Sequence, residues 1–285
     1  MKIVNLIEDT CRTSAYLEEH GLSFYVETPN HKLVVDTGAS DAFLENARRL
    51  KIDLSGVDTV ILTHGHLSHC GGVKALLELA PKATVYIRET AFGEFYNGAN
   101  VFDENFLRDN ARFIGIEKEL ASLPQVQLVY GDLVIDEELQ LFTNVVEREL
   151  WPACNLHLHR VIGETSEQDD FSHEQFLVVS AEGKRILFAG CCHGGIVNVM
   201  NAFQERFGSA PDLVVGGFHM MQKQYCGFSR ENLFLVDEIG RQLKDTPTRY
   251  YTCHCTGSIP YHRLKAQMGD KISYVYSGET VPLEG

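Results

Sequence analysis

The sequence lacks the features that mark a membrane protein or a nucleic-acid-binding protein. Its 285 residues contain no apolar run of about 18 residues, so we predict no membrane-spanning helix. Basic residues are comparatively few, with 25 lysines and arginines against 39 aspartates and glutamates, and the formal net charge is −14. Because nucleic acids attract basic surfaces, we expect no nucleic-acid partner. A local basic patch could still hold a small anion.

The sequence also shows no domain linker and no targeting signal. It has no Gly/Ser-rich linker and no repeat, and its start, MKIVNLIE, lacks the long apolar region and cleavage site of a signal peptide. We therefore expect a single domain over residues 1–285 and a cytoplasmic location. The eight cysteines agree with this, because adjacent Cys191-Cys192 and the Cys253-x-Cys255 pair suit reduced thiols or metal ligands better than disulfides.

The most informative stretch is residues 60–72, VILTHGHLSHCGG, in which three histidines lie within six residues. It begins with an apolar, β-branched run that is typical of a buried strand, and the run ends before His64. Loops at strand ends commonly carry functional side chains, and neutral imidazole is the commonest protein ligand for metals such as zinc. His64, His66 and His69 therefore indicate a metal site rather than an ordinary polar loop.

The segment THGHLSH resembles the His-x-His-x-Asp-His signature of the metallo-β-lactamase superfamily. The resemblance implies an α/β fold, a four-layer αβ/βα sandwich in which two mixed sheets pack together and helices cover both outer faces. Ser68 stands where the signature has its aspartate. A serine hydroxyl is a poor metal ligand at neutral pH and cannot act as a carboxylate base. The substitution affects the expected binding of the second metal and the catalytic role of position 68, but it does not affect the expected fold.

Hydrophobic periodicity predicts strands and helices along the whole chain. We expect strands at 2–8, 23–28, 32–35, 84–87, 126–130, 139–143, 156–159, 176–180, 185–189, 212–215 and 250–253, and helices at about 40–50, 71–79 and 196–207. Residues 88–125 interrupt this rhythm with an aromatic-rich insertion that includes Phe102, Phe106 and Arg108. The insertion has two interpretations: a lid or substrate wall beside the metal site, or a small helical subdomain or dimer contact.

The resemblance also implies metal ligands further along the chain. His173, before a predicted strand pair, corresponds to the histidine that completes the first metal site with His64 and His66. Cys191 occupies the position of the family's bridging aspartate, and a thiolate is a good ligand for zinc or iron. An inert buried thiol is the alternative. His254 corresponds to the last histidine of the family, which serves the second metal.

Five further residues complete the predicted site. Asp36 lies in an Asp-Thr-Gly turn that resembles the family turn supporting the histidine loop, since carboxylates commonly orient ligating imidazoles. His193 precedes Gly194, Gly195 and a predicted helix, so the glycine amides and the helix dipole predict an anion site with His193 facing the substrate. His219 ends another predicted strand, and we expect it beside the metals or the substrate.

The segments GCCHGGIVN, GGFH and CHCTG resemble the dihydropterin-synthase-like branch of the superfamily. The resemblance implies a metal-dependent hydrolase-like enzyme with one or two transition-metal ions, zinc first and iron or manganese as alternatives. Its substrate would be small, anionic, and phosphorylated or pterin-like. One alternative is a transferase that joins a pterin methyl diphosphate to an arylamine; another is a metal-binding protein with weakened catalysis, because of Ser68. We expect no membrane partner and leave a homo-oligomer open.

Overall fold

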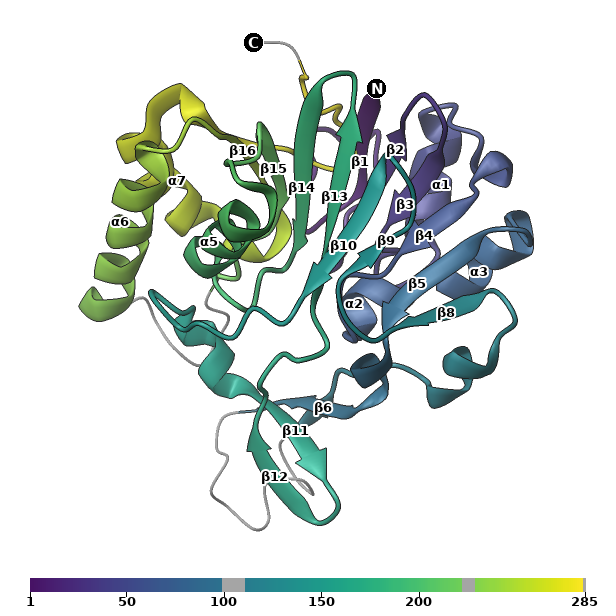
Figure 1. Cartoon of the computed structure of the whole chain (residues 1–285), viewed down its shortest axis with the longest axis horizontal. Coiled ribbons are helices and arrows are strands. Elements are labelled where there is room, and N and C mark those ends of the chain that lie inside the picture. The colour runs from purple at the N-terminus through teal and green to yellow at the C-terminus, as the bar shows by residue number, and fades with distance from the viewer. Residues whose placement is uncertain (99–110, 222–228, 284–285) are drawn as a thin grey trace.

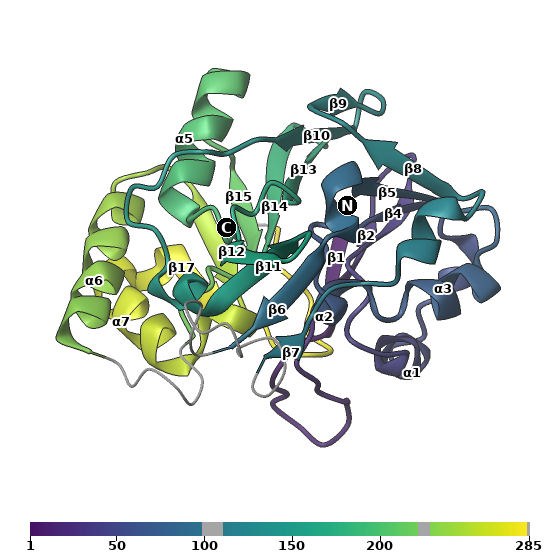
Figure 2. The same cartoon turned by 90° about the horizontal axis from the view of Figure 1, so that it is seen from below.

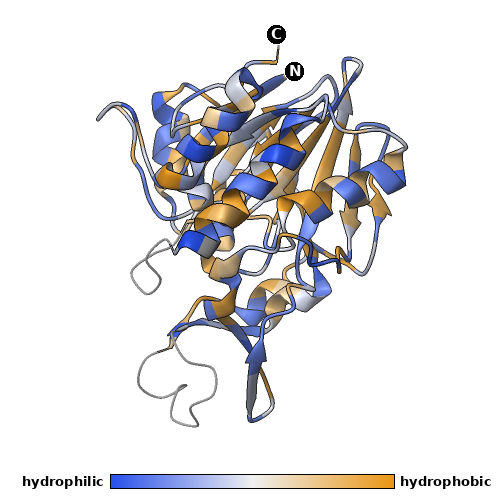
Figure 3. Cartoon of the chain, turned by 90° about the vertical axis from the view of Figure 1, so that its left-hand side faces the viewer, coloured by the Kyte–Doolittle hydropathy of each residue, from blue (hydrophilic) through white to orange (hydrophobic). Residues whose placement is uncertain are grey.

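The computed structural model describes residues 1–98, 111–221 and 229–283. Figure 1 shows two large sheets side by side in the centre of the molecule, with helices on both outer sides. Within these residues, no helix is long and apolar enough to cross a bilayer. The hydropathy colouring of Figure 3 shows largely apolar strands behind helices that carry both polar and apolar residues.

The first sheet is built mainly from the N-terminal half of the chain. Its described strands, in sheet order, are β1 (Lys2–Ile7), β2 (Ser23–Glu27), β3 (Lys32–Val35), β4 (Thr59–Ile61), β5 (Thr84–Arg88) and β8 (Val126–Val129). Pairing is antiparallel from β1 to β3 and parallel from β3 to β8. On its outer side lie α1 (Ala42–Arg49) and α3 (Val73–Leu79), and the short α2 (Leu67–Cys70) carries the end of the histidine loop.

The second sheet comes from the C-terminal half. Its described strands, in sheet order, are β17 (Ile272–Tyr274), β16 (Arg249–Thr252), β15 (Leu213–Gly216), β14 (Lys184–Gly190), β13 (Gln175–Ala181), β10 (Leu139–Thr143) and β9 (Leu133–Val134). Pairing is parallel from β17 to β14 and antiparallel from β14 to β9. The outer helices are α5 (Ile196–Phe207), α6 (Arg230–Lys244) and α7 (Ser258–Met268).

Apolar side chains hold the layers together in separate clusters. One cluster joins the first sheet to its helices through Phe43 and Leu76. Another lies between the two sheets, where the rings of Phe24 and Phe188 meet edge to face at 6.0 Å. A further cluster, which includes Phe203, joins the second sheet to its helices. Each buried side chain of this kind contributes about 1.5–3 kcal/mol to folding. The three clusters lie between helices and sheet, between the two sheets, and between sheet and helices, which confirms the predicted four-layer sandwich of two mixed sheets.

A smaller antiparallel sheet lies below the sandwich (Figures 1 and 2). Its described strands are β12 (Thr165–Gln168), β11 (Leu158–Ile162), β6 (Glu94–Asn97) and β7 (Arg112–Phe113). The described part of the insertion thus supplies strands and short 3-10 turns, which does not fit a helical subdomain there. Phe102, Phe106 and Arg108 lie outside the described residues. The lid, substrate wall and dimer contact stay predictions, as does a single domain over the whole chain.

The sequence placed most strands correctly but misjudged one near the site. The strand expected at 156–159 begins at Leu158, after a 3-10 turn over Ala153–His157. His159 is fully buried, so an exposed strand face is wrong for this residue. β11 lies between β6 and β12 as an inner strand of the small sheet, a placement that periodicity did not reveal.

Candidate metal centre

The carboxyl ends of strands from both sheets meet at one edge and carry the polar side chains of the site. Asp36 follows β3, and His64 lies in the loop that follows β4. Cys191, His219 and His254 follow β14, β15 and β16, which run parallel to one another and therefore end at the same edge. The topology thus explains why residues far apart in the sequence come together.

A first group consists of His64, His66 and His193, whose ligand atoms all lie within 4.8 Å of one another. Their Nε2 atoms are buried and have no hydrogen-bond partner in the described part of the chain. The Nδ1 atom of His64 lies 3.1 Å from the Thr63 hydroxyl, and that of His193 lies 3.0 Å from the Asn155 Oδ1 atom. Since a buried polar atom without a partner costs about 1–3 kcal/mol, these atoms fit a bound cation.

The environment keeps these imidazoles neutral, which is the form that ligates metals. Burial, followed by repulsion from neighbouring histidines, lowers the pKa of His64 and of His193 well below the ordinary value. Burial likewise lowers the pKa of His66 to about 4, although Asp169 opposes this shift. The lone pairs of the group are therefore available at neutral pH.

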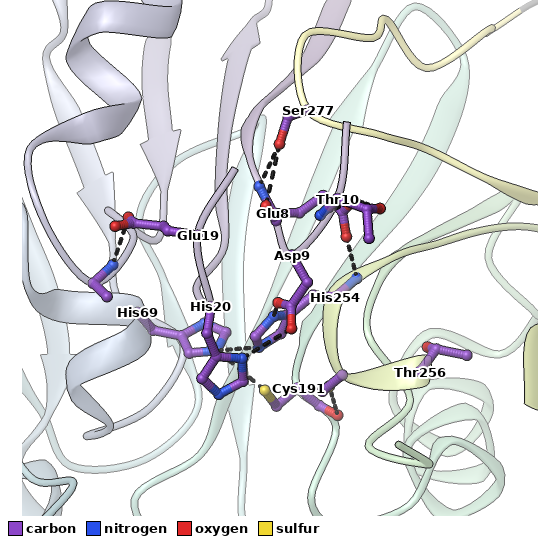
Figure 4. A network of polar contacts seen from close by, with 12 residues as sticks. Glu8, Asp9, Thr10, Glu19, His20, His69, Cys191, His254, Thr256 and Ser277 are labelled. Atoms are coloured by element: carbon purple, nitrogen blue, oxygen red, sulfur yellow. Dashed lines mark hydrogen bonds and ion pairs between the residues drawn. The ribbon is translucent and has the colours of Figure 1, made fainter. Parts of the chain in front are cut away.

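A second group consists of His69, His254 and Cys191 (Figure 4). The two Nε2 atoms lie 3.3 Å apart, and the Cys191 sulfur lies 3.1 Å from the His69 Nε2 atom. Two imidazole nitrogens at 2.0–2.1 Å from a tetrahedral zinc would be separated by about 3.3–3.4 Å. The spacing of the pair therefore fits one shared ion. Burial raises the pKa of the Cys191 thiol, so an ion would have to displace its proton.

Carboxylates fix both histidines of the second group. The His69 Nδ1–H donates to Asp36 Oδ2 at 2.7 Å, and the His254 Nδ1–H donates to Asp9. Asp36 also accepts hydrogen bonds from the Thr63 amide and hydroxyl, each at 2.8 Å, so it supports the histidine loop. With Nδ1 occupied in both rings, Nε2 is the atom left for a metal.

Glu8, Asp9 and His20 belong to this network and were not predicted (Figure 4). Glu8 accepts a hydrogen bond from the His254 amide at 2.8 Å, and Asp9 lies 3.0 Å from the His20 Nδ1 atom. Burial would raise the pKa of Asp9, but the neighbouring His254 and His20 lower it, so the carboxylate stays charged. Two acidic residues directly after a buried strand are the signal that could have found them.

His173 lies beside the first group, but both its ring nitrogens are engaged. Its Nδ1 atom accepts a hydrogen bond from the Gly65 amide at 3.1 Å, and its Nε2–H donates to Asp169 at 3.1 Å. His173, Asp169 and His66 also form a candidate metal group of their own. The structure thus brings His173 to the loop, while His193 meets His64 and His66 with an Nε2 atom that makes no hydrogen bond within the described residues.

The amides predicted to bind an anion already have partners inside the protein. The Glu174 carboxylate accepts hydrogen bonds from the His193 amide at 2.6 Å and the Gly194 amide at 2.8 Å. The Gly195 amide donates to the Cys192 carbonyl at 3.0 Å. The chain thus supplies its own acceptors for these amides, and the anion site at Gly194 and Gly195 stays a prediction. Sequence spacing gave no sign that Glu174 would turn toward α5.

Ser68 lies half-buried in α2, one residue before His69. A hydroxyl therefore stands at this position of the histidine loop. Gly65 has a steric role in the same loop, because a Cβ atom there would lie 2.2 Å from the Ala91 carbonyl oxygen. The glycine is needed for this close approach.

Unusual backbone conformations gather around the second group. Four non-glycine residues at this edge have a positive φ, namely Asp36 (59°), Cys192 (59°), His219 (48°) and His254 (48°). Such conformations cost of order 1–3 kcal/mol each and persist where the surroundings hold them, often at functional sites. They turn the chain sharply at the ends of β3, β14, β15 and β16.

Known proteins resemble this chain in sequence and in fold. Residues 17–166 match the family model described as the metallo-beta-lactamase superfamily. An uncharacterised protein of Methanocaldococcus jannaschii is 26% identical over 90% of this chain and 91% of its own length. The 7,8-dihydropterin-6-methyl-4-(beta-D-ribofuranosyl)-aminobenzene-5'-phosphate synthase of the same organism is 22% identical over 99% of this chain and 96% of its own.

A solved structure described as a metal-dependent hydrolase of the beta-lactamase superfamily aligns over the full length of both chains. Its TM-score is 0.78 and its sequence identity is 26%. The family model covers more than half of the chain, and this alignment extends the same fold to the rest. The chain is therefore a member of the metallo-beta-lactamase superfamily.

Proposed function

We propose that the protein is a metal-dependent, hydrolase-like enzyme that acts on a small phosphorylated or pterin-like substrate. The observation that carries the proposal is the set of buried Nε2 atoms of His64, His66 and His193, which accept or donate no hydrogen bond within the described residues. The pair formed by His69 and His254, with Cys191 beside it, supports a second ion. Two adjacent ions are the usual arrangement for displacement at phosphoryl and carbonyl centres.

Zinc is the metal that we propose first. The donors are imidazoles and one thiol, which suit a borderline-soft ion better than magnesium or calcium. Iron and manganese are alternatives, since imidazole and carboxylate donors also suit them. The donor set by itself does not separate zinc from iron.

Bound ions would supply Lewis acidity, positive charge for an anionic group, and a bound water of lowered pKa. The protein itself orients the ligands. Thr63 and Asn155 hold the Nδ1 atoms of His64 and His193, while Asp36 and Asp9 hold those of the second pair. Because Glu174 occupies the amides at the start of α5, that helix adds no free donors from His193 or Gly194 for the substrate.

A transferase is the second candidate. The synthase relative aligns with nearly the whole chain, and its name describes a dihydropterin joined to a ribosyl aminobenzene phosphate. Ser68 also favours this candidate, because no carboxylate at that position orients a water, whereas departure of a diphosphate needs positive charge more than a base. A catalytically weakened metal-binding protein is the third candidate. The anionic substrate, the cytoplasmic location and a homo-oligomer stay predictions.

A turnover screen on zinc-loaded protein tests the proposal. The panel should contain a phosphodiester, a lactone, and a pterin methyl diphosphate with and without an arylamine. We expect metal-dependent turnover of one class, and its loss in His66→Ala, because His66 belongs to the first group. Turnover only when the arylamine is present would favour the transferase. Stoichiometric metal without any turnover would overturn the enzyme proposal in favour of a binding protein.

A further inference from the structure

A sulfur-containing cluster lies next to the second group, and we call it the thiol pocket. It consists of Cys191, His219 and Cys255, whose ligand atoms all lie within 4.8 Å of one another. The three residues follow β14, β15 and β16, so the parallel strands of the second sheet deliver them to the same edge. Cys191 is shared with the second group, whereas His219 and Cys255 belong to the thiol pocket only.

His219 is the first sign that the pocket holds a ligand. Both of its ring nitrogens are buried and have no hydrogen-bond partner within residues 1–98, 111–221 and 229–283. Its ring lies against that of His193, with centroids 4.0 Å apart, so the imidazole faces the site. A neutral imidazole has one donor and one acceptor, and leaving both unsatisfied costs more than one lost hydrogen bond. A metal ion at one nitrogen would remove part of this cost.

The environment of the Cys255 sulfur is the second sign. The His219 amide donates a hydrogen bond to this sulfur at 3.3 Å, and the thiol contacts the Cys191 carbonyl at 3.6 Å. A Cβ atom at position 217 would lie 2.4 Å from the Cys255 sulfur, so the glycine at this position leaves room for the sulfur. Amide donors to sulfur favour the thiolate that ligates metals. The sulfur therefore sits in a shaped position with a donor directed at it.

We propose that the thiol pocket is a third metal position, which binds a thiophilic divalent ion, zinc in the first place. Two cysteines and one histidine form the ligand set that leaves zinc one open position, the arrangement of catalytic rather than closed structural sites. Because Cys191 is shared, loading the thiol pocket affects the second group. The first group uses none of these three residues, so the inference does not depend on the proposed enzymatic activity.

Titration of the metal-free protein with Co²⁺, a chromophoric substitute for zinc, tests the proposal. Thiolate ligation gives an absorption band in the near ultraviolet, which histidine ligation alone does not give. We expect this band in the natural protein, a weaker band in Cys191→Ser, which keeps only the Cys255 thiolate, and at least a ~10- to 100-fold weaker affinity in Cys255→Ser and His219→Gln. His219 is only half-buried, so its variant should fold even if that of Cys255 does not.

Two controls separate this inference from the proposed function. Cys192→Ser alters a neighbouring buried thiol that packs in an apolar cluster, and it should leave the band unchanged. His66→Ala should also keep the band, although it removes a ligand of the first group. If His219→Gln and folded Cys255→Ser both retain full intensity and affinity, the ion is held by Cys191 with histidines alone and the thiol pocket is not a metal position. Loss of the band in Cys192→Ser would equally overturn the proposal that the thiol pocket is a metal position.

Discussion

The Nε2 atoms of His69 and His254 lie 3.3 Å apart, although 185 residues separate them in the sequence. Each ring is held from behind by a carboxylate, Asp36 for one and Asp9 for the other. Burial lowers the pKa of His254 to about 4, so its ring is neutral at physiological pH. Two imidazoles whose Nδ1–H groups both point to carboxylates direct their Nε2 lone pairs at one another, and at this distance they require a cation between them or a proton on one of them.

Asp36→Asn and Asp9→Asn should each weaken the metal at the second group by about 10- to 100-fold, the usual effect of losing a carboxylate behind a ligating histidine. The asparagine side-chain oxygen can still accept the hydrogen bond from the imidazole, but it carries no negative charge. Competitive chelator titration measures the change. Asp41→Asn is the matched control, since Asp41 is exposed at the start of α1 and makes no side-chain cap there. Equal affinities in all four proteins would contradict the role given to the two carboxylates.

His193→Ala should remove more metal from the first group than His173→Ala does. The reason is that the His193 Nε2 atom is unpartnered, whereas both ring nitrogens of His173 are hydrogen-bonded. Elemental analysis after loading with limiting zinc gives the comparison. Asn155→Ala, which removes the partner of the His193 Nδ1 atom, should lie between the two. The reverse order would restore His173 as the third ligand, as the family resemblance implies.

Ser68→Asp should raise the affinity of the second site for metal and any hydrolytic side activity. A carboxylate adds negative charge and a directed lone pair, which the hydroxyl lacks. Ser68→Asn has a similar shape without the charge, so it should not reproduce the gain. Isothermal titration with zinc distinguishes the variants. An aspartate variant that binds no tighter than the natural protein would show that Cys191 and the two histidines already complete the site.

His31 should make the stability of the fold depend on pH. Burial opposes its charge, but hydrogen bonds to Asp58 and Asp136, both 2.8 Å, raise its pKa above the ordinary value. Its stabilising contribution is therefore complete below about pH 6.5 and is lost as the pH rises through the folded-state pKa. His31→Gln should lower the melting temperature at about pH 5.5 and much less at about pH 9. A loss that is equal at both pH values would contradict this account.

Local patterns predicted most strands of the two large sheets because these strands are buried, but α6 and α7 were not predicted. The helix Ile196–Phe207 and the strand Lys32–Val35 have the bounds expected from periodicity. The small sheet was missed because β7 has only two residues and the pairing of β6 with β11 joins distant segments. Strands this short carry too few residues for a clear alternation.

The site also contains a part that local sequence patterns predict and a part that depends on long-range contacts. The histidine loop is a local motif, so His64, His66 and His69 could be read from the sequence. The contact of Asp9 with His254 spans 245 residues and depends on how β1 and β16 end, which no local pattern reports. The choice between His173 and His193 depends on which ring nitrogen is left without a hydrogen bond, and the sequence does not show this. The contact of Glu174 with the amides before α5 depends on the tertiary fold and is likewise absent from any local pattern.

The central claim is that two ions are held by the Nε2 atoms of this edge. Anomalous diffraction at the zinc absorption edge, from crystals of the zinc-loaded protein, tests it most directly. We predict one peak in contact with His64, His66 and His193, and a second in contact with His69, His254 and Cys191. Peaks at His173 and Asp169 with none at His193, or no peak at this edge of the sandwich, would contradict the account.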